Sequence, residues 1–88
     1  MKIIKAASAG TLESSDVYVE VSPNEGVAVE IESVVLAQFG EAIDRAVRDV
    51  LSQCDVENAH VRIVDRGALE CVLRARVETA LMRGKEEA

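Results

Sequence analysis

The spacing of the apolar residues constrains the fold of this chain more than any other feature. Between residues 16 and 32, apolar side chains recur at every second position, first over 17–21 and again over 27–31. Such alternation is typical of strands with one buried face. The intervening residues 22–26, SPNEG, contain a proline and a glycine, which favour turns. We therefore predict two strands that pair as an antiparallel hairpin around residues 22–26.

From residue 36 onward the apolar spacing changes to three and four residues, which predicts an amphipathic helix of about 20 residues. Its stripe consists of Leu36, Phe39, Ile43, Val47, Val50 and Cys54. A third strand is expected over residues 59–64, and a second helix from residue 67 or 68 to Gly84. The stripe of this second helix consists of Leu69, Val72, Leu73, Val77, Ala80 and Leu81. We predict a two-layer α+β fold: a small, mainly antiparallel sheet (the hairpin plus one further strand) with both helices on one face.

The length of 88 residues fits a single domain spanning 1–88. Residues 1–15 show no clear period, so we expect a flexible N-terminal arm with a short strand near Ile3 and Ile4, and a frayed tail over 84–88. The apolar stretch at the N-terminus is interrupted by Lys5 and is too short for a secretion signal or a membrane span. A cytoplasmic location is therefore expected.

Charge and aromatic content exclude two classes of partner. The formal net charge is −6, and Tyr18 and Phe39 are the only aromatic residues. Nucleic-acid binding needs basic residues against the phosphates and aromatic residues against the bases, and anionic membranes repel an acidic protein. We therefore expect binding neither to nucleic acid nor to membranes, and a preference for basic protein surfaces.

Groups for catalysis or metal binding are scarce. His60 is the only histidine and falls on the outward side of a predicted strand, where it is expected to be an ordinary surface residue. Cys54 and Cys71 fall at apolar helical positions, where free cysteines are usually buried and unreactive. No residue spacing suggests a zinc site or a phosphate-binding loop. The expected protein is not an enzyme, has no catalytic residue and binds no metal.

One polar segment stands apart, residues 10–16 with the sequence GTLESSD. In one interpretation it is a loop whose hydroxyl groups bond to neighbouring backbone. In the other it is a site of covalent modification, which requires an exposed side chain on backbone that another enzyme can reach. Ser14 and Ser15 both meet that requirement, and the residues alone do not choose between them.

Three sequence blocks resemble one known family. Residues 9–17, AGTLESSDV, resemble the N-terminal signature of the citrate lyase acyl carrier protein (gamma subunit) family. Residues 38–43, QFGEAI, resemble its first-helix block, and residues 64–76, VDRGALECVLRAR, resemble its last-strand and last-helix block. Because the blocks occur in the right order and span almost the whole chain, from about Lys2 to Arg83, the resemblance is specific.

The resemblance implies a prosthetic group on Ser14. In the family, the serine after Thr-Leu-Glu carries a phosphoribosyl-dephospho-coenzyme A group, derived from triphosphoribosyl-dephospho-coenzyme A, through a phosphodiester. The thiol of this arm would carry acetyl and citryl thioesters while citrate is cleaved to acetate and oxaloacetate. Gly10 would give the arm segment freedom, and Glu13 and Asp16 would be read by the installing enzyme. The implied partners are the alpha and beta subunits of citrate lyase, the prosthetic-group transferase and the acetylating ligase.

Three alternatives remain at this point. One is the carrier subunit of malonate decarboxylase, a family that resembles this chain in its serine motif and would use the same kind of arm. A phosphopantetheine carrier is disfavoured, because those domains are helical bundles and this chain has strand patterns. A small α+β binding or regulatory module without any covalent group would share the fold, since one fold hosts many functions.

Overall fold

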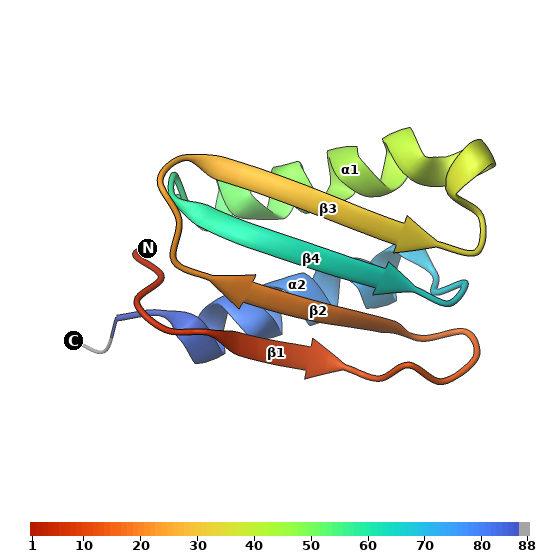
Figure 1. Ribbon diagram of the computed structural model, residues 1–88, viewed down its shortest axis with the longest axis horizontal. Helices are drawn as coiled ribbons and strands as arrows, with labels where there is room; N and C mark the ends of the chain where they lie inside the picture. Colours follow the sequence, from red (N-terminus) through yellow and green to blue (C-terminus); the bar gives the residue numbers. More distant parts are fainter. Residues whose placement is uncertain (87–88) are drawn as a thin grey trace.

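The computed structural model describes residues 1–86 and confirms the two-layer α+β fold class. The elements in chain order are β1 (Ala7–Gly10), β2 (Val17–Ser22), β3 (Val27–Ser33), α1 (Leu36–Gln53), β4 (Ala59–Asp65) and α2 (Glu70–Gly84). The four strands form one sheet, and both helices pack on the same face of it (Figure 1). Within the described residues, no helix is long and apolar enough to cross a membrane.

The predicted hairpin is wrong, because β4 lies between its two strands. The strand order is β1-β2-β4-β3, with β4 antiparallel to β2 and parallel to β3. Parallel neighbours need a crossover of at least a dozen residues. The 18-residue helix α1 supplies that crossover between β3 and β4. The outcome is a mainly antiparallel sheet with one parallel pair.

Residues 22–26 therefore carry the chain past the start of β4 instead of closing a hairpin. The amide of Gly26 donates a hydrogen bond to Asn58 Oδ1 at 2.8 Å, just before β4 begins. The amide of Ala59 donates to the carbonyl oxygen of Gly26 at 3.0 Å. The turn chemistry was thus recognised correctly, but the turn is bonded to the strand that separates β2 from β3.

The N-terminal segment differs from the predicted arm over residues 1–15. Part of it forms β1, Ala7–Gly10, which pairs antiparallel with β2. The strand expected near Ile3 and Ile4 is therefore displaced toward Gly10. Ile3 is buried and makes only an isolated bridge with Lys85. Strand pairing, which a weakly patterned segment does not reveal on its own, accounts for the difference.

The predicted frayed tail, residues 84–88, is held at its beginning by this N-terminal segment. Lys85 pairs with Ile3, and the amide of Glu86 donates a hydrogen bond to the carbonyl oxygen of Lys2 at 2.8 Å. Residues 87–88 of the predicted tail lie outside the described part. The two ends of the described chain thus lie side by side (Figure 1).

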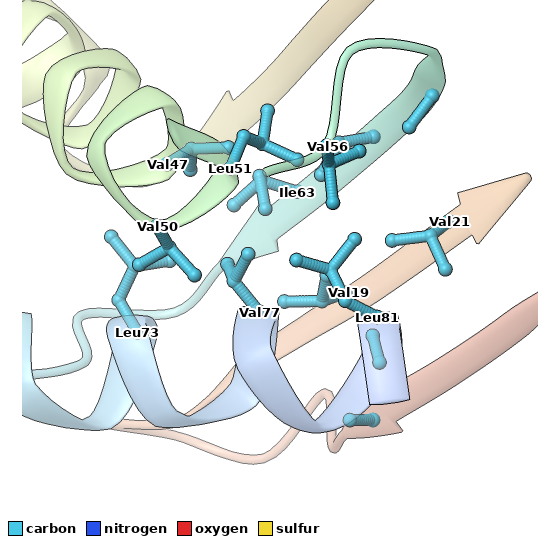
Figure 2. Close-up of a cluster of buried hydrophobic side chains, with 14 of the residues drawn as sticks. Val19, Val21, Val47, Val50, Leu51, Val56, Ile63, Leu73, Val77 and Leu81 are labelled. Carbon is cyan, nitrogen blue, oxygen red and sulfur yellow. The ribbon is translucent and has the colours of Figure 1, made fainter. Parts of the chain in front are cut away.

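The core is aliphatic and lies between the sheet and the helices (Figure 2). Its labelled side chains are Val19, Val21, Val47, Val50, Leu51, Val56, Ile63, Leu73, Val77 and Leu81. The inward residues of β2 are fully buried, whereas those of β3 are only half-buried. This contrast follows from the strand order, because β2 is a central strand and β3 an edge strand.

Three side chains of the predicted stripes, and one cysteine that was predicted to be buried, are more exposed than expected. Leu36 and Phe39, in the first turn of α1, are 47% and 52% exposed, and Leu69 at the start of α2 is 71% exposed. Cys71 is also exposed, so its predicted place in the core is wrong, while Cys54 is half-buried. The stripes are buried only where a helix lies over the sheet or the other helix, and their first turns extend beyond that contact.

Gly40 is the one glycine inside α1, and replacing it is expected to stabilise the protein. A Cβ at this position would lie 2.9 Å from Cδ1 of Leu36, the end of an exposed and flexible side chain. Because Leu36 can rotate away, Gly40→Ala should raise the free energy of unfolding by about 0.5–1 kcal/mol. Urea denaturation measures this. A lower stability would show that Leu36 is held in place.

Candidate functional site

Three loops leave the same end of the sheet. β1 and β4 both run antiparallel to β2, and β3 runs parallel to β4, so β1, β3 and β4 all point in one direction. Their carboxyl ends lead into residues 11–16, into α1 and into α2, at the end opposite the termini (Figure 1). The predicted attachment segment therefore lies at the same end as the first turns of both helices.

Ser14 and Ser15 occupy the middle of a turn. The amide of Asp16 donates a hydrogen bond to the carbonyl oxygen of Glu13 at 3.1 Å, which closes the turn around the two serines. Ser15 has a φ of 65°, in the left-handed region that non-glycine residues seldom adopt. Both serines are exposed, and neither hydroxyl group makes a hydrogen bond within residues 1–86. The turn thus presents both hydroxyl groups to solvent.

The turn is joined to the loop that follows β4. The amide of Ser15 donates a hydrogen bond to the carbonyl oxygen of Arg66 at 2.8 Å. The amide of Arg66 in turn donates a hydrogen bond to the carbonyl oxygen of Asp16 at 2.9 Å. These two bonds extend the pairing of β2 with β4, in which Val17 faces Asp65. The backbone directly after Ser14 is therefore fixed to the body of the domain.

Asp16 anchors the same turn through its side chain. Its carboxylate accepts hydrogen bonds from Thr11 Oγ1 at 2.6 Å, from the amide of Val17 at 2.8 Å and from Arg76 Nη2 at 3.1 Å. The bond from Thr11, then those from Val17 and Arg76, outweigh the effect of partial burial and lower the pKa of Asp16 from 3.8 to about 2. Asp16 therefore holds the turn in place, and Glu13 remains exposed.

The lowered pKa of Asp16 predicts a specific loss of stability in acid. Because folding lowers this pKa from 3.8 to about 2, the ionised carboxylate stabilises the folded state at higher pH. That contribution is lost as the pH falls from about 4 to about 2. We expect the protein with Asp16 to lose more stability over this pH interval than the Asp16→Asn variant, because asparagine does not titrate. Thermal unfolding at constant ionic strength checks this, and parallel pH profiles would contradict it.

Gly10 ends β1 at the entrance to the loop. Its φ is 91°, and a Cβ there would lie 1.8 Å from the carbonyl oxygen of Val17. Gly10 was expected to give the arm conformational freedom, but in the structure it has a different role. The absence of a side chain allows two backbone segments to approach closely where the loop begins and ends.

An apolar groove of about 350 Å³ lies at the same end, between the first turns of α1 and α2. Phe39 and Leu69 are the large exposed apolar residues of its lining, while Ile43 and Leu73 are buried. Sequence reasoning missed the groove, because helical periodicity marks a residue as apolar without showing whether anything covers it. The signal was present in the apolar first turns, but it was assigned to the core.

The fold and the site together are those of a carrier-type domain, a small scaffold that presents exposed hydroxyl groups on an accessible turn. The hydroxyl groups of Ser14 and Ser15 are exposed, and none of the described residues forms a cluster of three His, Cys, Asp or Glu side chains able to hold a metal ion.

Comparison with known proteins agrees with that class. The family described as malonate decarboxylase delta subunit (MdcD), an acyl carrier protein family, matches residues 4–84. The chain is 57% identical to the citrate lyase acyl carrier protein of Escherichia fergusonii, over 99% of this chain and 92% of that protein. It is 54% identical to the citrate lyase acyl carrier protein of Haemophilus influenzae (strain PittEE), with the same coverage. The chain belongs to the citrate lyase acyl carrier protein family, whose named members are carriers rather than enzymes.

A solved structure shares the fold. A chain in the crystal structure of a Pseudomonas malonate decarboxylase hetero-tetramer in complex with malonate superimposes with a TM-score of 0.81. The match covers 92% of this chain and 84% of that chain, at 18% sequence identity. At that identity the likeness concerns the fold alone. The resemblance noted in the three sequence blocks is confirmed by the closer relatives.

Proposed function

We propose that this chain is the acyl carrier subunit of a citrate lyase, with a phosphoribosyl-dephospho-coenzyme A arm attached to Ser14. Identities of 53–57% over nearly the full length to proteins named citrate lyase acyl carrier protein support the proposal. The observation that carries it is the position of Ser14. Its hydroxyl group is exposed, makes no hydrogen bond within residues 1–86, and lies on a turn tied to the domain by backbone bonds.

The residues around Ser14 suit the attachment of a bulky group. Ser14 Oγ would form the phosphodiester, and the hydrogen bonds of Ser15 and Asp16 would hold the turn outward while an installing enzyme acts on it. When bound, the arm supplies the thiol that carries acetyl and citryl groups as thioesters. The domain itself contributes tethering, which raises the effective concentration of the acyl group at the partners' active sites.

The proposed partners are the other subunits and the maturation enzymes of citrate lyase. The alpha subunit would exchange acetyl for citryl, and the beta subunit would cleave the citryl group to oxaloacetate. The prosthetic-group transferase and the acetylating ligase would prepare the arm. A net charge of −6 favours docking onto basic surfaces of these proteins, and we propose that the complex works in the cytoplasm.

The carrier subunit of a malonate decarboxylase is the second candidate function. The description of the matching family favours it. The identity of 57% to a citrate lyase carrier, against 18% to the Pseudomonas structure, supports citrate lyase as the first candidate.

The intact mass of the protein tests the proposal. The chain is produced in cells that also make the citrate lyase maturation enzymes and is then purified. Its intact mass is measured by mass spectrometry, and the modified residue is located by peptide mapping. We expect a phosphoribosyl-dephospho-coenzyme A adduct on the peptide containing Ser14. The loaded protein should then support citrate cleavage with alpha and beta subunits, and not malonate decarboxylation with the corresponding partners. A bare Ser14, when the same enzymes load a known carrier, would refute the carrier function.

A further inference from the structure

We propose that the apolar groove between the first turns of α1 and α2, with Arg66 beside it, binds the nucleotide portion of the arm on Ser14. The expected occupant is a tethered purine nucleoside with its adjoining phosphates. This inference rests on the proposed function, because it requires an arm on Ser14. It adds a resting position for that arm on the carrier itself.

The groove lies next to the attachment point. Hydrogen bonds of 2.8 Å and 2.9 Å join the backbone of Ser15 and Asp16 to Arg66. The residues that follow Arg66, Gly67 and Ala68, line the groove. A group tethered at Ser14 is therefore confined near the groove, at an effective concentration of the order of millimolar. Weak intrinsic affinity is sufficient under that condition.

The lining of the groove suits a flat ring. Phe39 is 52% exposed and Leu69 is 71% exposed, which leaves a large apolar surface open to solvent on a small acidic domain. Every nucleobase has an aromatic face that can stack on the ring of Phe39, with Leu69 as an apolar neighbour. The volume of about 350 Å³ falls within the range of roughly 300–1,000 Å³ found for small-molecule sites. Burial of a purine ring would cover the apolar surface that the fold leaves open.

Arg66 supplies an exposed positive charge next to the turn that holds Ser14. Its side chain is exposed and forms no ion pair within residues 1–86, whereas Arg74 and Arg76 are each paired with carboxylates. A guanidinium group binds phosphate through two parallel hydrogen bonds. Because the backbone of Arg66 is bonded to the turn that holds Ser14, its long side chain can reach a phosphate attached there.

The two carboxylates that line the groove are already engaged. Asp65 is buried, and its oxygens accept hydrogen bonds from Ser33 Oγ at 2.8 Å and from the amide of Ala68 at 3.0 Å. Glu70 forms an ion pair with Arg74 at 3.3 Å. Their negative charge is thus partly compensated, which reduces the repulsion that an acidic protein would otherwise exert on phosphates.

Nuclear magnetic resonance of the loaded and unloaded protein tests the inference. Intact mass first establishes that the arm is on Ser14. We expect the ring signals of Phe39 and the methyl signals of Leu69 to shift on loading, with nuclear Overhauser contacts from the adenine protons. The control is Met82, which is 47% exposed on the last turns of α2, away from the groove. Its methyl signal should not move.

Two variants sharpen the measurement. Leu69→Ser and Arg66→Ala should each weaken the nuclear Overhauser contacts between adenine and Phe39 and reduce the width of the adenine resonances. Met82→Ser should leave the contacts and the resonance widths unchanged. A verified adduct with no change at Phe39 and Leu69 overturns the inference and leaves the proposed function standing. Shifts that occur only after alpha or beta subunit is added also overturn it, because the groove is then a partner surface. No adduct, with active maturation enzymes, overturns the function and the inference together.

Discussion

Gly10→Ala is expected to lower the free energy of unfolding by about 3 kcal/mol. Two separate costs combine at this position. The φ of 91° is unfavourable for any residue with a side chain, and the new Cβ would lie 1.8 Å from the carbonyl oxygen of Val17. Because backbone rather than a flexible side chain blocks the space, β1 must shift from β2 to relieve the clash. Urea denaturation followed by circular dichroism measures the loss.

Gly26→Ala is the matched control. Gly26 also has a positive φ, 74°, but a Cβ there meets nothing within 4 Å. Its replacement should therefore cost only the conformational penalty of roughly 1–2 kcal/mol. The difference between the two variants isolates the steric contribution at Gly10. Equal losses would show that the end of β1 relaxes freely and that the close approach to Val17 is unimportant.

The faces of the strands were predictable, but their neighbours were not. Alternation identified Val17, Val19 and Val21 as buried, and all three are. A period of two shows which face of a strand is apolar, but it does not show which strand lies beside it. The missed signal was in β4, where Ile63 and the following Val64 are both buried. A strand with consecutive apolar residues is typical of the centre of a sheet.

The two parts of the candidate site differed in predictability. The polar segment around Ser14 was recognisable from its sequence and from the resemblance, and the structure places it on an exposed turn. The groove was not predictable, because its large exposed apolar residues, Phe39 and Leu69, continue the helical stripes. Whether the first turn of a helix lies over the sheet or beyond it depends on tertiary packing, which one-dimensional periodicity does not contain.

Ser14→Ala is expected to abolish attachment of the prosthetic group while leaving the fold intact. The hydroxyl group of Ser14 makes no hydrogen bond within the described residues, so the change in stability should stay within about 0.5 kcal/mol. The methyl side chain of alanine has no oxygen that could form the phosphodiester. The adduct is followed by intact mass during incubation with the maturation enzymes, and citrate cleavage by the reconstituted complex should be lost in parallel.

A variant of the neighbouring Ser15 is the control, because the sequence alone did not choose between the two serines. Ser15→Gly removes the second hydroxyl group, suits the φ of 65°, and keeps the amide that donates to the carbonyl oxygen of Arg66. This variant should therefore load at an undiminished rate. If Ser15→Gly fails to load while Ser14→Ala acquires the adduct, the attachment point is Ser15 and the position taken from the family motif is wrong. Loading of both variants would show that the turn presents two equivalent hydroxyl groups.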